Sequence, residues 1–166
     1  MSGHPKLIPA FTAKLKSGTP FPIGNAAAGA SKQVFPIAWG ELRSVEDFPI
    51  ALKAEVQYGS DTVQIEPSQS HVRIAVNAVL KTQTGSHLVY KYHGIVKIDP
   101  AFMAIFAASP DAKTTDFGNA FTSIQFETGD EKLKALDYGI FVGSARFVVE
   151  QDGQIVIETK ISQVVP

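Results

Sequence analysis

The segment FGNAFTSIQFETGDEKLKALDYGIFVG, residues 117–143, decides how this chain is expected to fold. Residues 121–127 alternate in character, and Thr122, Ile124 and Phe126 fall on one side of the alternation. A period of two residues is typical of a pleated strand whose two faces meet different surroundings. The segment therefore begins as a strand.

A short helix is expected after this strand, over residues 130–137. Thr128 and Asp130 are good N-cap residues, and Glu131 places an acid in the first turn. Tyr138-Gly139 then ends the helix. Extended structure is predicted to resume directly afterwards.

The composition describes one neutral domain. The chain has 166 residues and a formal net charge of −1, from 15 basic and 16 acidic residues. A chain of this length is most simply a single domain, residues 1–166, that buries a sizeable core. The absence of a basic surface argues against nucleic acid and anionic membranes as partners. A small molecule or another protein is the expected partner.

The sequence predicts neither a metal site nor a cofactor. It contains no cysteine, and His71, His87 and His93 lack the spacing of metal-binding histidines. It also lacks a glycine-rich phosphate loop and a nucleophile elbow. We therefore expect chemistry that uses side chains alone.

The N-terminal sequence MSGHPKLIPA has neither the basic start nor the apolar run of a signal peptide. No stretch approaches the length of a membrane span. A cytoplasmic protein is the expectation. Residues 1–6 are expected to be disordered, and residues 20–32, rich in Gly, Ala and Pro, are expected to form a loop.

Strands with turn signals between them recur along the chain. The longest pair is predicted over residues 71–80 and 87–98, joined at Thr84-Gly85. Asp152-Gly153 predicts another hairpin near the C-terminus, and Asp99-Pro100 begins a helix through residue 108. Many short strands without βαβ alternation predict an all-β protein, most economically a single antiparallel β-barrel with one or two short helices.

Four segments resemble a known family: LIPAFTAKLKSGTPFPIG, VFPIAWGEL, TGSHLVYKYHG and FETGDEKLKALDYGIFVG. In this order and spacing they are similar to DUF3237, a family of unknown function, and the resemblance covers nearly the whole chain. It implies a small calycin-like antiparallel barrel. It also implies a functional lead, because fungal members resemble accessory isomerases or cyclases of polyketide and phenolic secondary metabolism, including a chalcone-isomerase-like type.

The chain departs from the family pattern at three places, one of which is Trp39-Gly40 where the family has a doubled glycine. Phe121 stands where the family usually has an arginine. A Gly-Gly-x-Asp-Trp turn is typical of the family, whereas this chain has GSDTV at residues 59–63. Asp61 and Glu127 match the pattern. A polar site carried over from the family is therefore only partly present.

Aromatic side chains are the candidate substrate-binding residues. Trp39, Tyr58, Tyr90 and Tyr92 fall on strand faces that are expected to point inward, since each alternates with polar residues or follows an apolar stripe. Such groups line apolar pockets and orient phenolic ligands, but they are equally typical of an ordinary barrel core. Phe121 and Phe141 complete the candidate binding set.

Candidate catalytic residues are the two tyrosines Tyr90 and Tyr92 together with Arg73, His93 and Glu127. Arg73 would stabilise a developing enolate or phenolate if its face lined the barrel, and His93 suits acid-base work near neutral pH. Glu127 is a general base or a structural acceptor for the following turn. A solvated outer face is the simpler interpretation of Arg73 and His93, because the opposite strand faces are aliphatic or aromatic.

Two functions from different classes remain. The first is a cofactor-free isomerase or cyclase that folds a phenolic or polyketide-type substrate inside the barrel, in a chalcone-isomerase-like intramolecular cyclisation. The second is a non-catalytic carrier of an apolar metabolite. A pathway accessory that stabilises a partner enzyme is a third interpretation, and the oligomeric state, including a homo-oligomer, stays open.

Overall fold

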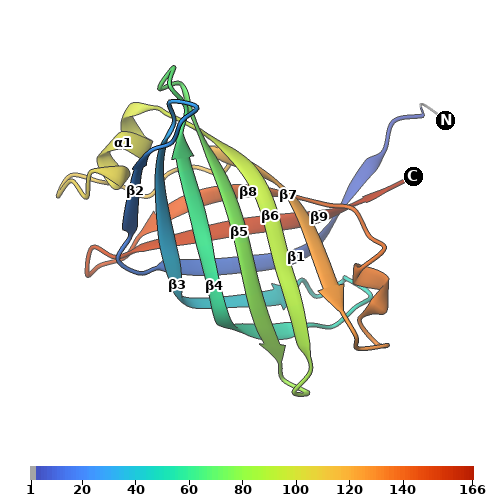
Figure 1. Ribbon diagram of the computed structural model, residues 1–166. Coiled ribbons are helices and arrows are strands. Elements are labelled where there is room, and N and C mark those ends of the chain that lie inside the picture. Colours follow the sequence, from blue (N-terminus) through green and yellow to red (C-terminus); the bar gives the residue numbers. More distant parts are fainter. Residues whose placement is uncertain (1–2) are drawn as a thin grey trace.

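Residues 3–166, the part of the chain that the computed structural model describes, form one antiparallel sheet of nine strands that closes on itself (Figure 1). The strands are β1 (Lys6–Ser17), β2 (Phe21–Asn25), β3 (Ser31–Ser44), β4 (Lys53–Ile65), β5 (His71–Thr82), β6 (His87–Lys97), β7 (Ala120–Thr128), β8 (Phe141–Val149) and β9 (Ile155–Val165). Their order is β1-β9-β8-β7-β6-β5-β4-β3-β2. Pairing of β1 with β3 closes a barrel of eight strands and leaves β2 outside it. The predicted antiparallel barrel is confirmed.

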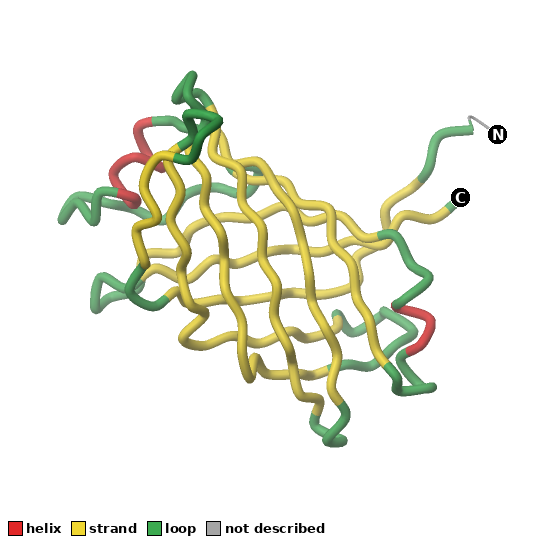
Figure 2. The backbone as a smooth tube through the Cα atoms, viewed as in Figure 1, coloured by secondary structure: helices red, strands yellow, loops and turns green. Residues whose placement is uncertain are grey.

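Tight hairpins connect the long strands, as the turn sequences predict. Gly85 has a φ of 91° between β5 and β6, and Gly153 has a φ of 79° between β8 and β9. Glycine reaches these positive φ values without a steric penalty. Loops therefore gather at the two ends of the barrel, while strands make up the whole of its wall (Figure 2).

The helix after β6 forms where its cap predicts. Helix α1 (Pro100–Phe106) has Asp99 at its N-cap, and the Asp99 side chain accepts a hydrogen bond of 2.8 Å from the amide of Phe102. Proline at the first helical position needs no hydrogen-bond partner for its nitrogen. The helix lies across one end of the barrel (Figure 1).

The predicted helix over residues 130–137 is shorter than expected. Only the 3-10 helix η1 (Lys134–Leu136) forms there. The Asp130 carboxylate accepts hydrogen bonds from the hydroxyl of Ser86 and from the amide of Lys132, at 2.7 and 2.9 Å. These bonds hold a turn in place of a first α-helical turn, because aspartate can satisfy nearby backbone groups outside a helix.

The expected loop over residues 20–32 is wrong for residues 21–25. Strand β2 pairs there with β3, with Phe21 opposite Val34 and Asn25 opposite Ser31. The sequence contains Pro and Gly but still supplies enough backbone groups to pair with the edge of β3. The disorder expected for residues 1–6 lies partly outside the described residues, and Lys6 already belongs to β1.

Gly59-Ser60-Asp61 stand where the family has a turn and are turn residues by propensity, so a turn is expected there. This expectation is wrong, because these residues continue strand β4. A β-bulge between Val56 and Tyr58 inserts one extra residue opposite β5: Val56 pairs with Leu80, whereas Tyr58 pairs with Val79. A bulge shifts the alternation by one residue. Tyr58 is therefore 76% exposed instead of inward, and Asp61 points into the barrel with 5% of its surface exposed.

Trp39 is placed outside by a similar irregularity. The expectation that Trp39 points inward is wrong, since Trp39 is 44% exposed. The ladder between β1 and β3 shifts at this point: Lys16 pairs with Trp39, and the next residue, Ser17, pairs with Ile37. The alternation before and after this point therefore differs by one residue.

Aromatic side chains fill one half of the barrel interior. Phe11 packs against Phe48, Phe126 and Phe141, with ring centroids 4.9, 5.5 and 5.9 Å apart, and Tyr90 stacks on Phe126 at 5.6 Å. These side chains belong to one buried cluster. A second buried cluster, which includes Phe102 and Ile105 of α1, occupies the opposite half.

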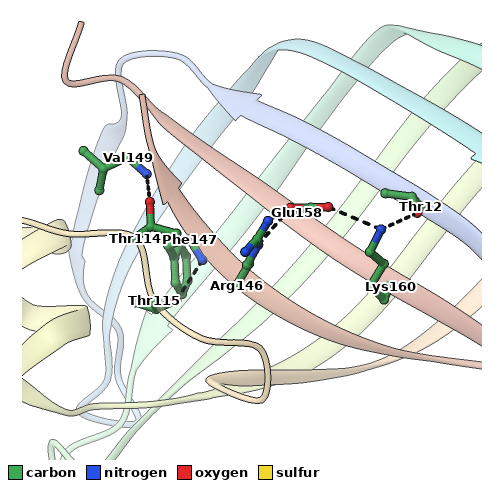
Figure 3. A network of polar contacts seen from close by, with 8 residues as sticks. All are labelled: Thr12, Thr114, Thr115, Arg146, Phe147, Val149, Glu158 and Lys160. Atoms are coloured by element: carbon green, nitrogen blue, oxygen red, sulfur yellow. Dashed lines mark hydrogen bonds and ion pairs between the residues drawn. The ribbon is translucent and has the colours of Figure 1, made fainter. Parts of the chain in front are cut away.

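Polar contacts fasten the segment after α1 to the barrel (Figure 3). The hydroxyls of Thr115 and Thr114 accept hydrogen bonds of 3.0 Å from the amides of Phe147 and Val149 in β8. On the outer face of β8 and β9, Arg146 pairs with Glu158 at 2.7 Å. These contacts fix the end of the barrel that α1 covers. No helix of residues 3–166 has the length and apolar character needed to cross a membrane.

Candidate functional site

The half of the barrel beneath α1 contains a cavity of about 500 Å³. Helix α1 supplies Phe102, Ile105 and Phe106 to its wall, and the strands supply further apolar side chains. These include Val63, Ile74, Val96, Phe147, Ile155 and Ile157. A volume of this size suits a drug-sized organic molecule.

Polar side chains from four different strands also line this cavity. They are Asp61 of β4, Tyr92 of β6, Thr122 of β7 and Thr159 of β9. All are buried, with exposed fractions of 5%, 2%, 6% and 3%. A few polar groups on an apolar wall are the usual composition of a small-molecule site.

Asp61 is the carboxyl group on the wall of this cavity. Burial raises the pKa of its carboxyl from 3.8 to about 6, and a backbone hydrogen bond from Ala75 acts in the opposite direction. Its Oδ1 atom finds no hydrogen-bond partner among the described residues. A desolvated carboxyl with this pKa exchanges protons near neutral pH.

Tyr92 lies close enough to Asp61 for the two groups to affect each other. Burial raises the pKa of Tyr92 well above its usual value, and the charges of Asp61 and Tyr90 raise it further. The phenol therefore keeps its proton at neutral pH. Tyr92 can donate a hydrogen bond, but it cannot act as a base.

The rim of the cavity combines the end of β1 with the turn before β9. Residues 16–19 and Gln154 contribute to it. Lys16, the cation at the rim, is paired with Glu150, and its Nζ atom lies 3.0 Å from Oε2 of that residue. The charge of Lys16 is therefore balanced outside the apolar interior.

The structure brings only one of the predicted catalytic residues to the cavity, namely Tyr92. Tyr90 is buried in the aromatic cluster, and its hydroxyl has no hydrogen-bond partner within residues 3–166. Phe141, a predicted binding residue, is 0% exposed and packs in the same cluster. Their alternation indicated the inward face but could not show at which level of the barrel the cavity lies.

The other predicted site residues lie on the outer surface. Arg73 forms an ion pair with Glu66, and Glu127 forms one with Lys91. His93 is exposed on the outer face of β6. The simpler interpretation of Arg73 and His93, a solvated face, agrees with this placement, so interior roles for these three residues have no geometric support.

Phe121 is exposed as well, at 64%, on the outer face of β7. Together with Arg73, His93 and Ile95 it lines a hollow on the outside of the barrel. The expectation that Phe121, Trp39 and Tyr58 bind substrate in the interior is therefore not supported by their positions. Phe121 lies on the outer face because side chains alternate along β7, and Thr122 and Ile124 take the inward positions.

Sequence reasoning missed Asp61, Thr122 and Thr159 as cavity residues. Thr122 was assigned correctly to one face of its strand, but a threonine on that face carries no functional signal by itself. The one available signal was the agreement of Asp61 with the family pattern. The turn propensity of Gly59-Ser60-Asp61 argued against Asp61 as a cavity residue, because a turn residue is not expected on the inner wall of a barrel.

A metal site made of side chains would require several acidic or histidine side chains close together. Within residues 3–166, no group of three or more His, Asp or Glu side chains is arranged to hold a metal ion.

The closed barrel and its lined interior define a small β-barrel protein with a cavity of ligand size. Residues 5–164 match the family described as "Protein of unknown function (DUF3237)". The chain belongs to this family, and the resemblance noted from the sequence is confirmed. No curated protein sequence matches the chain.

Solved structures share the fold at low sequence identity. A conserved protein of unknown function from Rhodopseudomonas palustris has a TM-score of 0.79 at 20% identity, covering 99% of this chain and 100% of that chain. A β-barrel-like protein from Acinetobacter baumannii has a TM-score of 0.72 at 18% identity, with coverages of 99% and 98%. An enzyme from Penicillium herquei has a TM-score of 0.65 at 13% identity, with coverages of 99% and 97%.

Proposed function

We propose that this protein is an isomerase or cyclase that acts, without a cofactor, on a phenolic or polyketide-type small molecule held inside the barrel. The observation that carries the proposal is the Asp61 carboxyl, buried on the wall of an apolar cavity with Oδ1 unpartnered and with a pKa raised to about 6. A group that titrates near neutral pH both accepts and returns a proton efficiently. That the related barrel from Penicillium herquei is described as an enzyme supports a catalytic role.

The proposed reaction is an intramolecular ring closure of a hydroxychalcone-type enone. The Asp61 carboxylate accepts the proton of the phenolic hydroxyl while the phenolic oxygen bonds to the β-carbon of the enone. The electron pair of the double bond moves to the carbonyl oxygen, which becomes an enolate. The α-carbon then takes the proton back from Asp61, so the product is an isomer of the substrate.

Tyr92 is suited to stabilise the enolate formed in this step. Its phenol stays protonated because burial and the nearby Asp61 raise its pKa. A fixed donor in a water-poor cavity stabilises a developing negative charge more than water does. In this proposal Asp61 moves the proton and Tyr92 holds the charge.

The first experiment follows ring closure of an ortho-hydroxychalcone by the loss of its visible absorbance. The uncatalysed reaction serves as the baseline, since such ring closures proceed slowly in water. Turnover above that baseline, with a rate that rises as Asp61 loses its proton around pH 6, is the expected result. Binding without turnover at any pH from about 5 to 9 would favour the carrier instead, because an apolar cavity of this size also suits a carrier.

Replacing Tyr92 by Phe is expected to lower kcat about 100-fold to 1000-fold, since one oxyanion donor is typically worth that much. The measurement is steady-state kinetics on the ortho-hydroxychalcone, with the folding of the variant checked by circular dichroism.

Tyr90→Phe is the matched control. The ring centroids of Tyr90 and Tyr92 lie 5.4 Å apart, but Tyr90 does not line the cavity. Removing its buried, unpartnered hydroxyl should leave kcat unchanged and should be neutral or stabilising by about 1 kcal/mol. Equal losses of kcat in both variants would contradict the assignment of Tyr92.

A further inference from the structure

Thr122 carries the second unpartnered oxygen of the cavity. Its Oγ1 atom, like Oδ1 of Asp61, has no hydrogen-bond partner among residues 3–166. The residue lines the cavity and is only 6% exposed. Buried hydroxyls in proteins are almost always hydrogen-bonded, so this one is available to a ligand.

Gly143 keeps this hydroxyl uncovered. It lies in β8 directly opposite Thr122 in the ladder. A Cβ atom at this position would lie 2.5 Å from Oγ1 of Thr122 and 2.7 Å from Cγ2 of Thr159. Any larger residue would therefore collide with the hydroxyl, whereas glycine leaves it accessible.

The strand on the other side of Thr122 has the same feature. Gly94 of β6 pairs with Thr122, and a Cβ atom there would lie 2.7 Å from its Cγ2 atom. Thr122 is thus flanked by glycine on both neighbouring strands. The residues paired with it in the two ladders therefore place no side chain over its hydroxyl.

Asp61 and Thr122 lie on well-separated parts of the wall. Strands β4 and β7 are separated by β5 and β6 in the sheet. Adjacent strands are about 4.8 Å apart, so the two backbones are roughly 14 Å apart along the wall. Both side chains point inward, which brings their oxygen atoms to on the order of 10 Å from each other.

We propose that Asp61 and Thr122 bind the two ends of one ligand, which selects an aromatic molecule with an oxygen function at each end. The proposal rests on the proposed function in placing the reacting hydroxyl at Asp61. Thr122 is then a specificity-determining residue that binds the far hydroxyl or carbonyl. A ligand with one oxygen function would leave Thr122 unpaired in the complex, and buried unpaired groups lower affinity.

The experiment uses probes that cannot cyclise. Hydroquinone, the linear naphthalenediol and the para-linked biphenol are each compared with the corresponding monophenol, by calorimetry or by NMR titration. The three diols increase in length and so sample the separation of the two anchors. For the diol of matching length, we expect the wild-type protein to bind it about tenfold more tightly than its monophenol, as one added hydrogen bond allows.

Three variants identify the anchor. Thr122→Val removes the hydroxyl with little change of shape and should abolish the tenfold preference, while the affinity for the monophenol is unchanged. Thr122→Ser keeps a hydroxyl and should keep the preference. Thr62→Val makes the same chemical change beside Asp61 but outside the cavity wall, and it should behave as the wild type does.

The outcomes separate this inference from the proposed function. A preference for a diol that survives in Thr122→Val, or the absence of a preference at every length, overturns the inference even if the chalcone is turned over. A preference that depends on Thr122 supports the inference even if no chalcone is turned over. In that case the proposed cyclase activity is wrong, but the assignment of Asp61 and Thr122 as the two ligand-binding residues is supported.

Discussion

Asp61→Asn is expected to make the protein more stable at pH 7, by roughly 3 kcal/mol, while lowering turnover about 100-fold to 10,000-fold. The stability gain follows from the pKa of Asp61, which burial raises from 3.8 to about 6. A raised carboxyl pKa means that the folded protein holds the charged form less well than the unfolded chain does. The amide is uncharged and avoids this penalty.

The sign of the pH dependence is a sharper test than the stability alone. Below about pH 4 the carboxyl is protonated in both the folded and the unfolded state, so the wild type and the Asp61→Asn variant should differ little. From about pH 4 to about pH 6 the unfolded state loses its proton first, and the wild type loses stability relative to the variant. Above about pH 6 the difference stays constant.

The measurement is urea unfolding of the wild type and of Asp61→Asn at several pH values. Asp111→Asn is the control, because Asp111 is an exposed acid in the loop after α1. A constant difference between the wild type and Asp61→Asn at all pH values would show that the buried charge is not the cause. An equally stable variant with full turnover would remove Asp61 from the proposed mechanism.

Phe141→Ala is expected to destabilise the barrel by about 3 to 5 kcal/mol, the usual loss for a buried phenylalanine. Phe141 is 0% exposed, and its ring meets Phe126 and Phe11 with centroids 5.2 and 5.9 Å away. The variant leaves a cavity that the rigid strands around it cannot close. Thermal and urea unfolding measure the loss directly.

Phe121→Ala is the matched control for this change. It removes the same side chain from the neighbouring strand, where 64% of the residue is exposed. A loss below about 1 kcal/mol is expected, as for most surface substitutions. Similar losses in both variants would contradict the assignment of Phe141 to the core and of Phe121 to the surface.

Patterns that repeat over many residues were sufficient to predict the fold. The alternation in β5, β6 and β7 indicated strands with two different faces, and the glycines at positions 85 and 153 indicated the hairpins. The cap at Asp99 indicated the start of α1. Each of these signals is local, or is reinforced by a long regular strand, and does not depend on distant contacts.

The candidate site could not be predicted in the same way, because it depends on interruptions of the pattern. One bulge exchanges the faces of Tyr58 and Asp61, and nothing in the local sequence marks its position. Glycine, serine and aspartate are turn residues by propensity, yet here the ladders with β3 and β5 keep them in a strand. The position of the cavity depends on how all eight strands close, which no single segment determines.

The bulge gives β4 one residue more than its ladder with β5 requires, because Val56 and Tyr58 pair with the adjacent residues Leu80 and Val79. Gln57 is that extra residue. Loss of its codon would join the two halves of β4 into one regular alternation that still turns Asp61 inward. The same loss at Ser60, with the bulge kept, would instead displace Asp61 by one position in the ladder and turn it outward. The inward orientation of Asp61 would therefore survive deletion of Gln57 at the bulge. It would not survive deletion of Ser60, three residues later in the same strand.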